Sequence, residues 1–413
     1  MIDRRKVLGA AGVAVGGVAA AGLVAGCGPA TATPSWRPPG SNPDPAGPST
    51  GPAELTIVPA DAAKNVSPAQ PVTVTAVTGT LQNVAITGPG GKAVAGELAA
   101  DGKSWRSTGT LTYGQTFTVT AAAISAPGAT PVSKTSRFST LKPAKTVSVA
   151  FQQSAMGALK TGAKYGVGTV IGVHFSRAPA DKDAAAKAIE VISDPQVEVR
   201  PHWLDDQTVH FRPEQYWAAG TKVTVNAKVY GVNVGKGVYG KANSSVSFTI
   251  GPSRVAIADD DTHQMKVYID GKLTRTIPIS MGKGGTVTTT TGTTDFWTPT
   301  GTMIVMTKEP SHQMTSASFG ITDPKDPNFY DELITLCCRI TYSGVFVHSA
   351  PWSVSDQGHR DVSHGCINIS PSNAQWFFNT FQLGDVVQVK NTGKKMPTYN
   401  SMGGAWMIPW SQY

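Results

Sequence analysis

The stretch SHGCINIS, Ser363 to Ser370, sets one cysteine into a chain that is otherwise rich in Thr, Val, Gly and Pro. Cys366 follows a Ser-His-Gly run and precedes the apolar Ile367. A cysteine in such a place can be a buried thiol, half of a disulfide, a metal ligand or a nucleophile. The number and positions of the other cysteines and histidines narrow these four interpretations.

The chain has four cysteines, of which Cys27 belongs to the N-terminal segment. Three thiols remain, so at least one of them cannot pair within the chain. Cys337 and Cys338 are neighbours on a strand-like pattern, and we expect them to point to opposite faces in structural roles, since a disulfide between them would be strained. Cys366 has no second Cys or His at zinc-ligand spacing, because His359 lies in loop sequence. We therefore predict no metal.

The surroundings of Cys366 favour a nucleophile. Gly365 allows a tight turn and the approach of a substrate, and the N–H groups of such a turn can stabilise an oxyanion. We also expect a helix directly after the motif to favour the thiolate. His348, 18 residues upstream at the end of an apolar strand, is the expected base. The nearer His364 sits on the turn, from which its ring tends to point elsewhere.

Length and composition predict several strand-rich domains. A chain of 413 residues is long enough for two to four domains. Charged residues make up only 15% of it, with 44 Gly and 29 Pro, which favours strands and turns over long charged helices. The net charge of +8 comes from scattered Lys and Arg without aromatic interleaving, so we predict no nucleic-acid partner.

The N-terminus reads as an export signal. A basic start is followed by a weakly apolar Ala/Gly/Val run that ends in small residues before Cys27, which disfavours a transmembrane anchor. This ending resembles a bacterial lipobox, which implies lipidation of Cys27, while Arg4-Arg5 resembles a twin-arginine signal; the route of export stays open. We predict a lipid-anchored protein facing the cell wall or periplasm. We expect the Pro-rich residues 28–52 to form an extended tether of roughly 3 Å per residue.

A weak internal repeat occupies the middle of the chain. LTYGQTFTVTA (111–121) followed by FSTLKP (138–143) matches QYWAAGTKVTVNA (215–227) followed by FTIGPS (248–253). Each copy reads as a glycine turn, an alternating strand, a loop and a short final strand. Two such units of about 100 residues predict two immunoglobulin-like β-sandwiches, without disulfides.

The pattern changes near residue 252. Residues 255–280 read as two strands joined at a hairpin turn, Asp270-Gly271, and residues 340–349 as an alternating strand. Residues 370–381 predict a helix capped by Ser370 or Ser372, with Trp376, Phe377 and Phe381 packed inward. We expect the Trp-containing tail to pack on the body of the protein.

At this point a family resemblance is clear. HSAPWSVSDQGHRDVSHGCINIS (348–370) resembles the signature of the L,D-transpeptidases with a YkuD-type catalytic domain, and the match includes SMGKG (280–284) and TPTG (298–301). The tandem sandwiches resemble the mycobacterial members. The resemblance implies a mainly β protein whose β-rich catalytic domain has one or two helices and a C-terminal subdomain. The predicted divisions are a lipoprotein signal peptide at 1–27, a linker at 28–52, immunoglobulin-like domains at 53–145 and 146–251, the catalytic domain at 252–390 and a flap at 391–413.

The resemblance also assigns roles to single residues. Cys366 would be the nucleophile, and His348 the base and then the acid, held by a backbone carbonyl that we expect to be that of Ser349. N–H groups of His364, Gly365 and Cys366 would form the oxyanion hole, with the hydroxyl of Tyr330 nearby. The residues expected to line or shape the site are Ser343, Gly344, Trp352, Ser363 and Asn368, with Met314 on a lid over it.

The implied reaction joins peptidoglycan stem peptides without a cofactor. A tetrapeptide stem would acylate the cysteine with loss of D-alanine, and the amine of a second stem would resolve the acyl-enzyme to a 3→3 cross-link. Carbapenem β-lactams are expected covalent inhibitors. The same site could instead serve an L,D-carboxypeptidase or an enzyme that attaches a protein to the wall. A wall-binding lipoprotein without activity is disfavoured, because His348, Gly365, Cys366 and Asn368 are intact.

Overall fold

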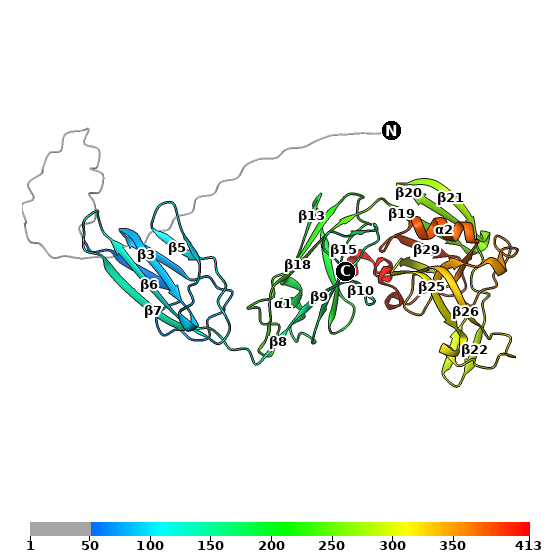
Figure 1. The fold of residues 1–413 in the computed structure, drawn as a ribbon, viewed down its shortest axis with the longest axis horizontal. Helices are drawn as coiled ribbons and strands as arrows, with labels where there is room; N and C mark the ends of the chain where they lie inside the picture. The colour runs from blue at the N-terminus through cyan, green and yellow to red at the C-terminus, as the bar shows by residue number, and fades with distance from the viewer. Residues whose placement is uncertain (1–50) are drawn as a thin grey trace, which may run out of the picture. The chain divides into compact units, whose positions relative to one another are not determined.

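The computed structural model describes residues 51–413 (Figure 1). The predicted signal peptide, Cys27 and nearly all of the linker therefore lie outside the described residues. Within residues 51–413, two α-helices, α1 (Lys182–Lys187) and α2 (Pro371–Thr380), accompany 29 strands. No helix in this range is long and apolar enough to cross a membrane.

The first sandwich packs two antiparallel sheets on each other. One sheet has the order β1 (Glu54–Val58), β2 (Thr73–Thr78), β5 (Ser104–Ser107), β4 (Gly96–Leu98). The other has the order β3 (Thr80–Thr87), β6 (Thr116–Ile124), β7 (Val132–Ser139). Alternate residues of β6 are buried, as a strand with one face on a core requires. Trp105, Phe117 and Phe138 fill the space between the sheets.

The second sandwich repeats this arrangement. One sheet runs β10 (Gly157–Ala158), β9 (Val149–Ser154), β12 (Ile171–Phe175), β15 (Thr208–Pro213), β14 (Val199–Trp203), and the other runs β11 (Lys164–Tyr165), β18 (Ser244–Ile250), β16 (Lys222–Ala227), β13 (Ile189–Asp194). A parallel pair, β8 (Lys145–Val147) and β17 (Val238–Gly240), lies beside them. Helix α1, capped by Asp181, was not expected, because six residues are too few to show a helical period.

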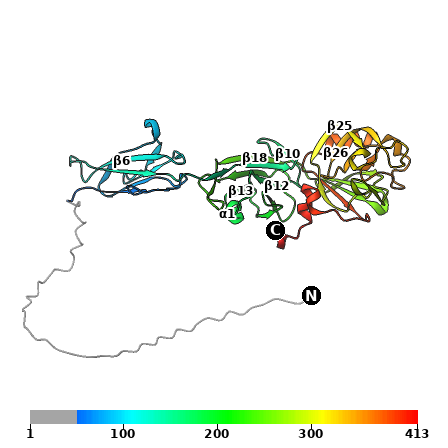
Figure 2. The same cartoon turned by 90° about the horizontal axis from the view of Figure 1, so that it is seen from below.

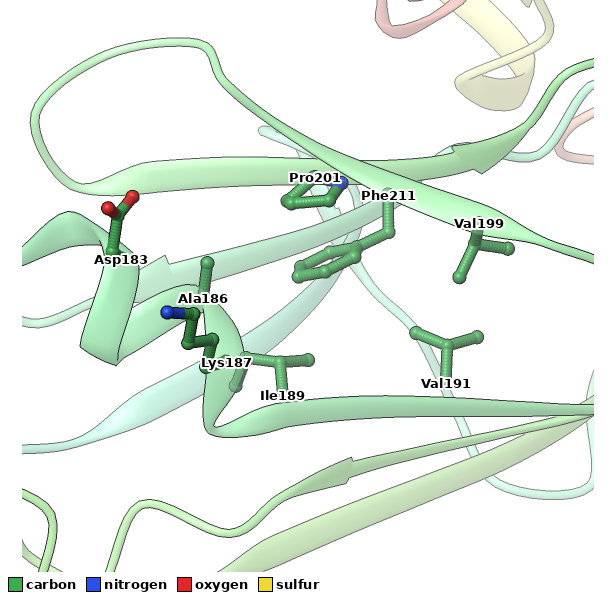
Figure 3. A pocket seen from close by; sticks show the side chains of 8 residues that line it. All are labelled: Asp183, Ala186, Lys187, Ile189, Val191, Val199, Pro201 and Phe211. Carbon is green, nitrogen blue, oxygen red and sulfur yellow. The ribbon is translucent and has the colours of Figure 1, made fainter. Parts of the chain in front are cut away.

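An apolar cavity of about 400 Å³ lies within this second sandwich (Figure 3). Ile189, Val191, Val199 and Phe211 line it, and Asp183 and Lys187 of α1 supply its charged groups. All of its lining residues belong to α1, β13, β14 and β15. The cavity is therefore separate from the Ser-His-Gly-Cys motif.

The catalytic region is again built from two sheets. The first has the order β21 (Lys272–Pro278), β20 (Gln264–Ile269), β19 (Arg254–Asp259), β29 (Val386–Lys390), β24 (Gly301–Ile304). The second has the order β25 (Thr307–Thr315), β26 (Asp331–Arg339), β27 (Phe346–Ser349), β28 (Ile367–Ile369). Strands β25 and β26 lie side by side in both ribbon views (Figures 1 and 2). A hairpin, β22 (Thr286–Thr289) with β23 (Gly292–Asp295), extends from the region.

Helix α2 closes the core between these sheets, as predicted. The Ser370 side chain caps it by accepting a hydrogen bond from the Asn373 N–H. Phe377 and Phe381 are buried and stack with ring centroids 3.9 Å apart, while Trp376 is only partly buried. Cys338 belongs to the same core, whereas its neighbour Cys337 faces the other side of β26.

Two strand predictions need correction. Residues 255–280 form three strands and not two, because a turn at Asp260–Thr262 ends on His263 with a left-handed φ of 50° before the expected hairpin at Asp270-Gly271. Residues 340–349 do not form one alternating strand. β27 covers only Phe346–Ser349 and all four of its side chains are buried, because its two faces pack on different apolar clusters, one with Val347 and one with Phe346.

The tail packs on the second sandwich. Trp406 donates its indole N–H to the carbonyl oxygen of Gly168 at 2.8 Å. Arg212 donates to the carbonyl oxygens of Ala405 and Ile408, and its guanidinium lies 4.1 Å from the ring centroid of Tyr413. The tail was predicted to pack on the body of the protein, and these contacts show that it packs on the second sandwich.

Candidate active site

Strand pairing brings the two predicted catalytic side chains to one place. β27 and β28 run parallel, with Val347 opposite Ile367 and His348 opposite Asn368. Cys366 comes two residues before Asn368, so it lies on the same face as Asn368 and His348. The 18-residue spacing between His348 and Cys366 is thus the length of the connection between two neighbouring parallel strands.

The thiol of Cys366 lies in apolar surroundings. Cys366 packs against a cluster of Ile334, Cys337 and Phe346. Its Sγ is 3.8 Å from the carbonyl oxygen of Gly344, a weak hydrogen-bond contact. Burial raises the pKa of Cys366 to about 11, although the Phe346 backbone and the charge of Arg339 oppose this rise.

The expected helix effect on the thiol is therefore wrong. Strand β28 separates Cys366 from α2, which begins only at Pro371. The influence of a helix terminus falls off within about one turn, so it does not reach the sulfur. The resting thiol is protonated at neutral pH.

His348 is fixed in one tautomer. Its Nδ1 lies 2.8 Å from the carbonyl oxygen of Ser349, and because a carbonyl can only accept, Nδ1 carries the proton. Nε2 then keeps a lone pair and can act as a base. Burial lowers the pKa of His348 to about 4, so the ring is neutral at pH 7. The exposed ring of Trp352 stacks beside it with centroids 6.0 Å apart.

In the turn before Cys366, the N–H of Gly365 does not face the site where an oxyanion would form, contrary to the prediction. The Gly365 N–H donates to Ser363 Oγ at 3.0 Å, and this hydroxyl in turn donates to the Cys366 carbonyl oxygen at 2.7 Å. Gly365 is thus not free to stabilise an oxyanion through its N–H. The N–H groups of His364 and Cys366 have no partner among the described residues. Ser363 shapes this turn, and Gly365 is needed there for its φ of 132°.

Thr298 is a buried residue to which sequence reasoning gave no role. Its hydroxyl donates to the Gly365 carbonyl oxygen at 2.8 Å and accepts from the Gly282 N–H at 2.9 Å. It ties the turn of the motif to the segment that contains SMGKG. Its position in the sequence could have indicated a role, since Thr298 is the first residue of the TPTG run that resembles the family.

The ring of His364 lies against aromatic side chains. Its centroid is 4.8 Å from that of Phe296 and 4.9 Å from that of Tyr330, and Lys283 Nζ is 3.3 Å from its Nε2. Burial and then the charge of Lys283 lower the pKa of His364 to about 4. Burial raises the pKa of Tyr330 to about 12, with a further contribution from Cys366, so its hydroxyl keeps a proton that it can donate.

The other predicted residues surround this centre in different ways. Asn368 is buried and donates to Ser353 Oγ at 3.1 Å, which supports the turn that carries Trp352. Ser343 is exposed, and its N–H and hydroxyl bond to the side chain of Asn400. Met314 lies on β25 and packs against the same apolar cluster as Cys366, so the expected lid region contains a strand.

Comparison with known proteins places the chain in a family. A family model described as the L,D-transpeptidase catalytic domain matches residues 253–389, and one described as a bacterial Ig domain matches residues 63–233. L,D-transpeptidase 2 of Mycobacterium tuberculosis (strain CDC 1551 / Oshkosh) is 38% identical over 361 residues, which is 87% of this chain and 84% of that protein. The chain belongs to the L,D-transpeptidase family.

Two further proteins are similar to this L,D-transpeptidase. L,D-transpeptidase 5 of Mycobacterium tuberculosis (strain ATCC 25618 / H37Rv) is 31% identical over 417 residues, covering 100% of this chain and 84% of that protein. The crystal structure of L,D-transpeptidase 3 from Mycobacterium tuberculosis in complex with a faropenem-derived adduct is 31% identical and aligns over 59% of this chain and 98% of that one, with a TM-score of 0.44. The predicted fold class is confirmed: a mainly β protein with immunoglobulin-like structure before the catalytic domain.

The shifted pKa values of this L,D-transpeptidase predict a neutral resting pair. With the pKa of His348 near 4 and that of Cys366 near 11, neither side chain is charged at pH 7. We expect alkylation of Cys366 by iodoacetamide to be slow at neutral pH and to rise tenfold per pH unit up to about pH 11, because only the thiolate reacts. Peptide mapping by mass spectrometry would follow the adduct. A rate already at its plateau at pH 7 would show a thiolate–imidazolium pair instead.

Proposed function

We propose that this chain is a peptidoglycan L,D-transpeptidase that forms 3→3 cross-links through a thioester on Cys366. The observation that carries the proposal is the parallel pairing of β27 and β28, which sets His348 and Cys366 on one face, with the Ser349 carbonyl fixing the tautomer of the base. Family membership supports the same chemistry.

The first half-reaction acylates the enzyme. Nε2 of His348 takes the proton of Cys366 as Sγ attacks the carbonyl carbon of the third stem residue, a diamino acid. The negative charge that develops on the carbonyl oxygen meets the free N–H groups of His364 and Cys366 and the hydroxyl of Tyr330. The C–N bond then breaks, and His348 returns the proton to the amine of departing D-alanine.

The second half-reaction transfers the acyl group. The side-chain amine of a second stem attacks the thioester carbon while His348 takes a proton from that amine. The C–S bond breaks, the thiol of Cys366 is restored, and the product is a 3→3 cross-link. Water as acceptor would instead give an L,D-carboxypeptidase, and an amine on another protein would give attachment to the wall.

We further propose the cellular setting and the division of the chain. The N-terminal sequence supports lipidation of Cys27 and a position outside the membrane, with residues 28–52 as a tether. Residues 53–145 and 146–251 then space the catalytic domain, 252–390, and its flap, 391–413, from the lipid anchor. β-Lactams of the carbapenem class should acylate Cys366, since their carbonyl is a strained acyl donor.

Incubation with a disaccharide-tetrapeptide tests the proposed reaction. We expect mass spectrometry to show a dimer that has lost one D-alanine. The matched control is a tetrapeptide whose side-chain amine is acetylated, which should acylate the enzyme but give no dimer. Tripeptide as the sole product from both peptides would identify a carboxypeptidase, and no product from either would remove the enzymatic proposal.

A further inference from the structure

Arg339 lies on the same face as the catalytic pair, one strand further from Cys366. It is the last residue of β26 and pairs with Phe346 at the start of β27. Its guanidinium lies 4.2 Å from the centroid of the Phe346 ring. Because Val347 pairs with Ile367, Phe346 in turn lies beside Cys366. Arg339, Phe346 and Cys366 thus follow one another across three neighbouring strands.

The guanidinium of Arg339 has no polar partner among residues 51–413. Its side chain makes no hydrogen bond or ion pair with these residues. Its Nε is buried and has no hydrogen-bond acceptor. Glu309, whose pKa Arg339 helps to lower against the effect of burial, already accepts hydrogen bonds from Thr307 and His312. A buried donor without an acceptor is costly, so this arrangement calls for an explanation.

Two other arginines whose side chains are largely buried have polar partners. Arg212 donates to the carbonyl oxygens of Pro213, Glu214, Ala405 and Ile408. Arg254 pairs with the buried carboxylate of Asp385. The fold therefore supplies partners where an arginine serves packing alone, and Arg339 lacks them at the edge of the active site.

Gly344 lies close to both Arg339 and the thiol of Cys366. A Cβ on Gly344 would lie 3.7 Å from Nη1 of Arg339, and the carbonyl oxygen of the same residue is 3.8 Å from Sγ of Cys366. The guanidinium is near enough to the sulfur that its charge lowers the pKa of Cys366 against the effect of burial.

We propose that Arg339 binds the free α-carboxylate of the residue that Cys366 displaces from the donor stem. In a tetrapeptide that carboxylate is attached to the Cα that follows the scissile bond, about 4 Å from the attacked carbon. A planar guanidinium can bind it with two parallel hydrogen bonds. A longer stem carries an amide at this place, so Arg339 selects the tetrapeptide. This inference rests on the proposed function and names the residue that distinguishes a tetrapeptide donor from a longer stem.

The competing explanation is that Arg339 only stacks on Phe346. The ratio of kcat/KM for two donor substrates separates the explanations, because a purely structural role of Arg339 would change kcat/KM for both substrates alike. The donors are a stem tetrapeptide with a free C-terminal carboxylate and the same peptide as a C-terminal amide. The variants are Arg339→Met and Arg339→Lys. Lys308→Met is the matched control. Lys308 lies on β25 opposite Cys338, and its Nζ is 4.6 Å from the centroid of the Phe378 ring. Its side chain therefore stacks on an aromatic ring as that of Arg339 does, but on the face of the sheet that packs on α2.

The measurement is kcat/KM for cleavage of the last residue from each donor. We expect the unaltered enzyme to prefer the free acid by about 10- to 100-fold, the range of a charged hydrogen bond. Arg339→Met should bring the free acid to the rate of the amide, Arg339→Lys should keep part of the preference, and Lys308→Met should keep all of it. Alkylation of Cys366 by the neutral iodoacetamide would show that the thiol of each variant is accessible.

Three results would overturn the inference in distinguishable ways. An undiminished preference in Arg339→Met would leave only the stacking role. Equal rates for both donors with the unaltered enzyme would show that no carboxylate is recognised, while cross-linking itself stands. Cleavage of neither donor would remove the proposed function, and the inference with it.

Discussion

Replacing Cys366 by alanine should abolish the release of D-alanine from a stem tetrapeptide. The proposed mechanism has no other nucleophile, so a loss of about 10⁴-fold or more in kcat is expected, the scale seen when a covalent catalyst is removed. Chromatographic detection of D-alanine measures this directly. The same variant should show no mass increase at residues 363–370 after exposure to a carbapenem.

Cys338→Ala is the matched control, which tests whether the loss of activity in Cys366→Ala comes from unfolding. Cys338 is fully buried in the catalytic core and faces away from the site. Cys338→Ala should lower the free energy of unfolding by about 1–2 kcal/mol, as expected for removing a buried sulfur, yet leave D-alanine release within a few-fold. Cys366→Ala should lower the free energy of unfolding by a similar amount, about 1–2 kcal/mol, since its sulfur also packs in an apolar cluster. Release of D-alanine by a folded Cys366→Ala protein would show that another group is the nucleophile.

The sequence alone could predict that His348 and Cys366 lie together, because their spacing fits two neighbouring parallel strands. His348 is the last residue but one of β27 and Cys366 directly precedes β28, and a connection between parallel strands needs a dozen or more residues. The carbonyl of Ser349 was also predictable, since it follows His348 directly and lies within reach of the ring. These features depend on residues that are close in sequence to one motif.

Features that depend on competing hydrogen bonds could not be read from the motif. The Gly365 N–H was expected to face the substrate, but Ser363 Oγ, two residues away, takes it. The sequence shows both groups and does not show which acceptor is nearer. The left-handed turn at His263 was missed for a similar reason, because neither Gly nor Asn marks it.

Arg339 illustrates a second limit. On its own strand it is one arginine among scattered basic residues, 27 positions before Cys366. Its relation to the site appears only when β26, β27 and β28 are placed in register, which sets Arg339, Phe346 and Cys366 side by side. Three-strand register is a tertiary property, and periodicity within one strand does not determine it.

Replacing His348 by glutamine should reduce acylation by about 10³- to 10⁴-fold and change its dependence on pH. In the unaltered enzyme the base is effective above its pKa of about 4, so the rate should be nearly flat from pH 6 to pH 9. Without the base, only the small fraction of thiolate can attack. The rate of His348→Gln should therefore rise tenfold per pH unit toward the pKa of Cys366, about 11.

His210 supplies the matched control for this prediction. It is buried in the second sandwich, and burial lowers its pKa to about 4 as well. His210→Gln removes a buried neutral imidazole of the same kind from a place remote from the thiol, so both the rate and its flat pH profile should persist. Single-turnover acylation measured from pH 5 to pH 10 distinguishes the two variants. A flat profile in His348→Gln would mean that another residue takes the proton of Cys366, and the base assignment would then fail while the nucleophile stands.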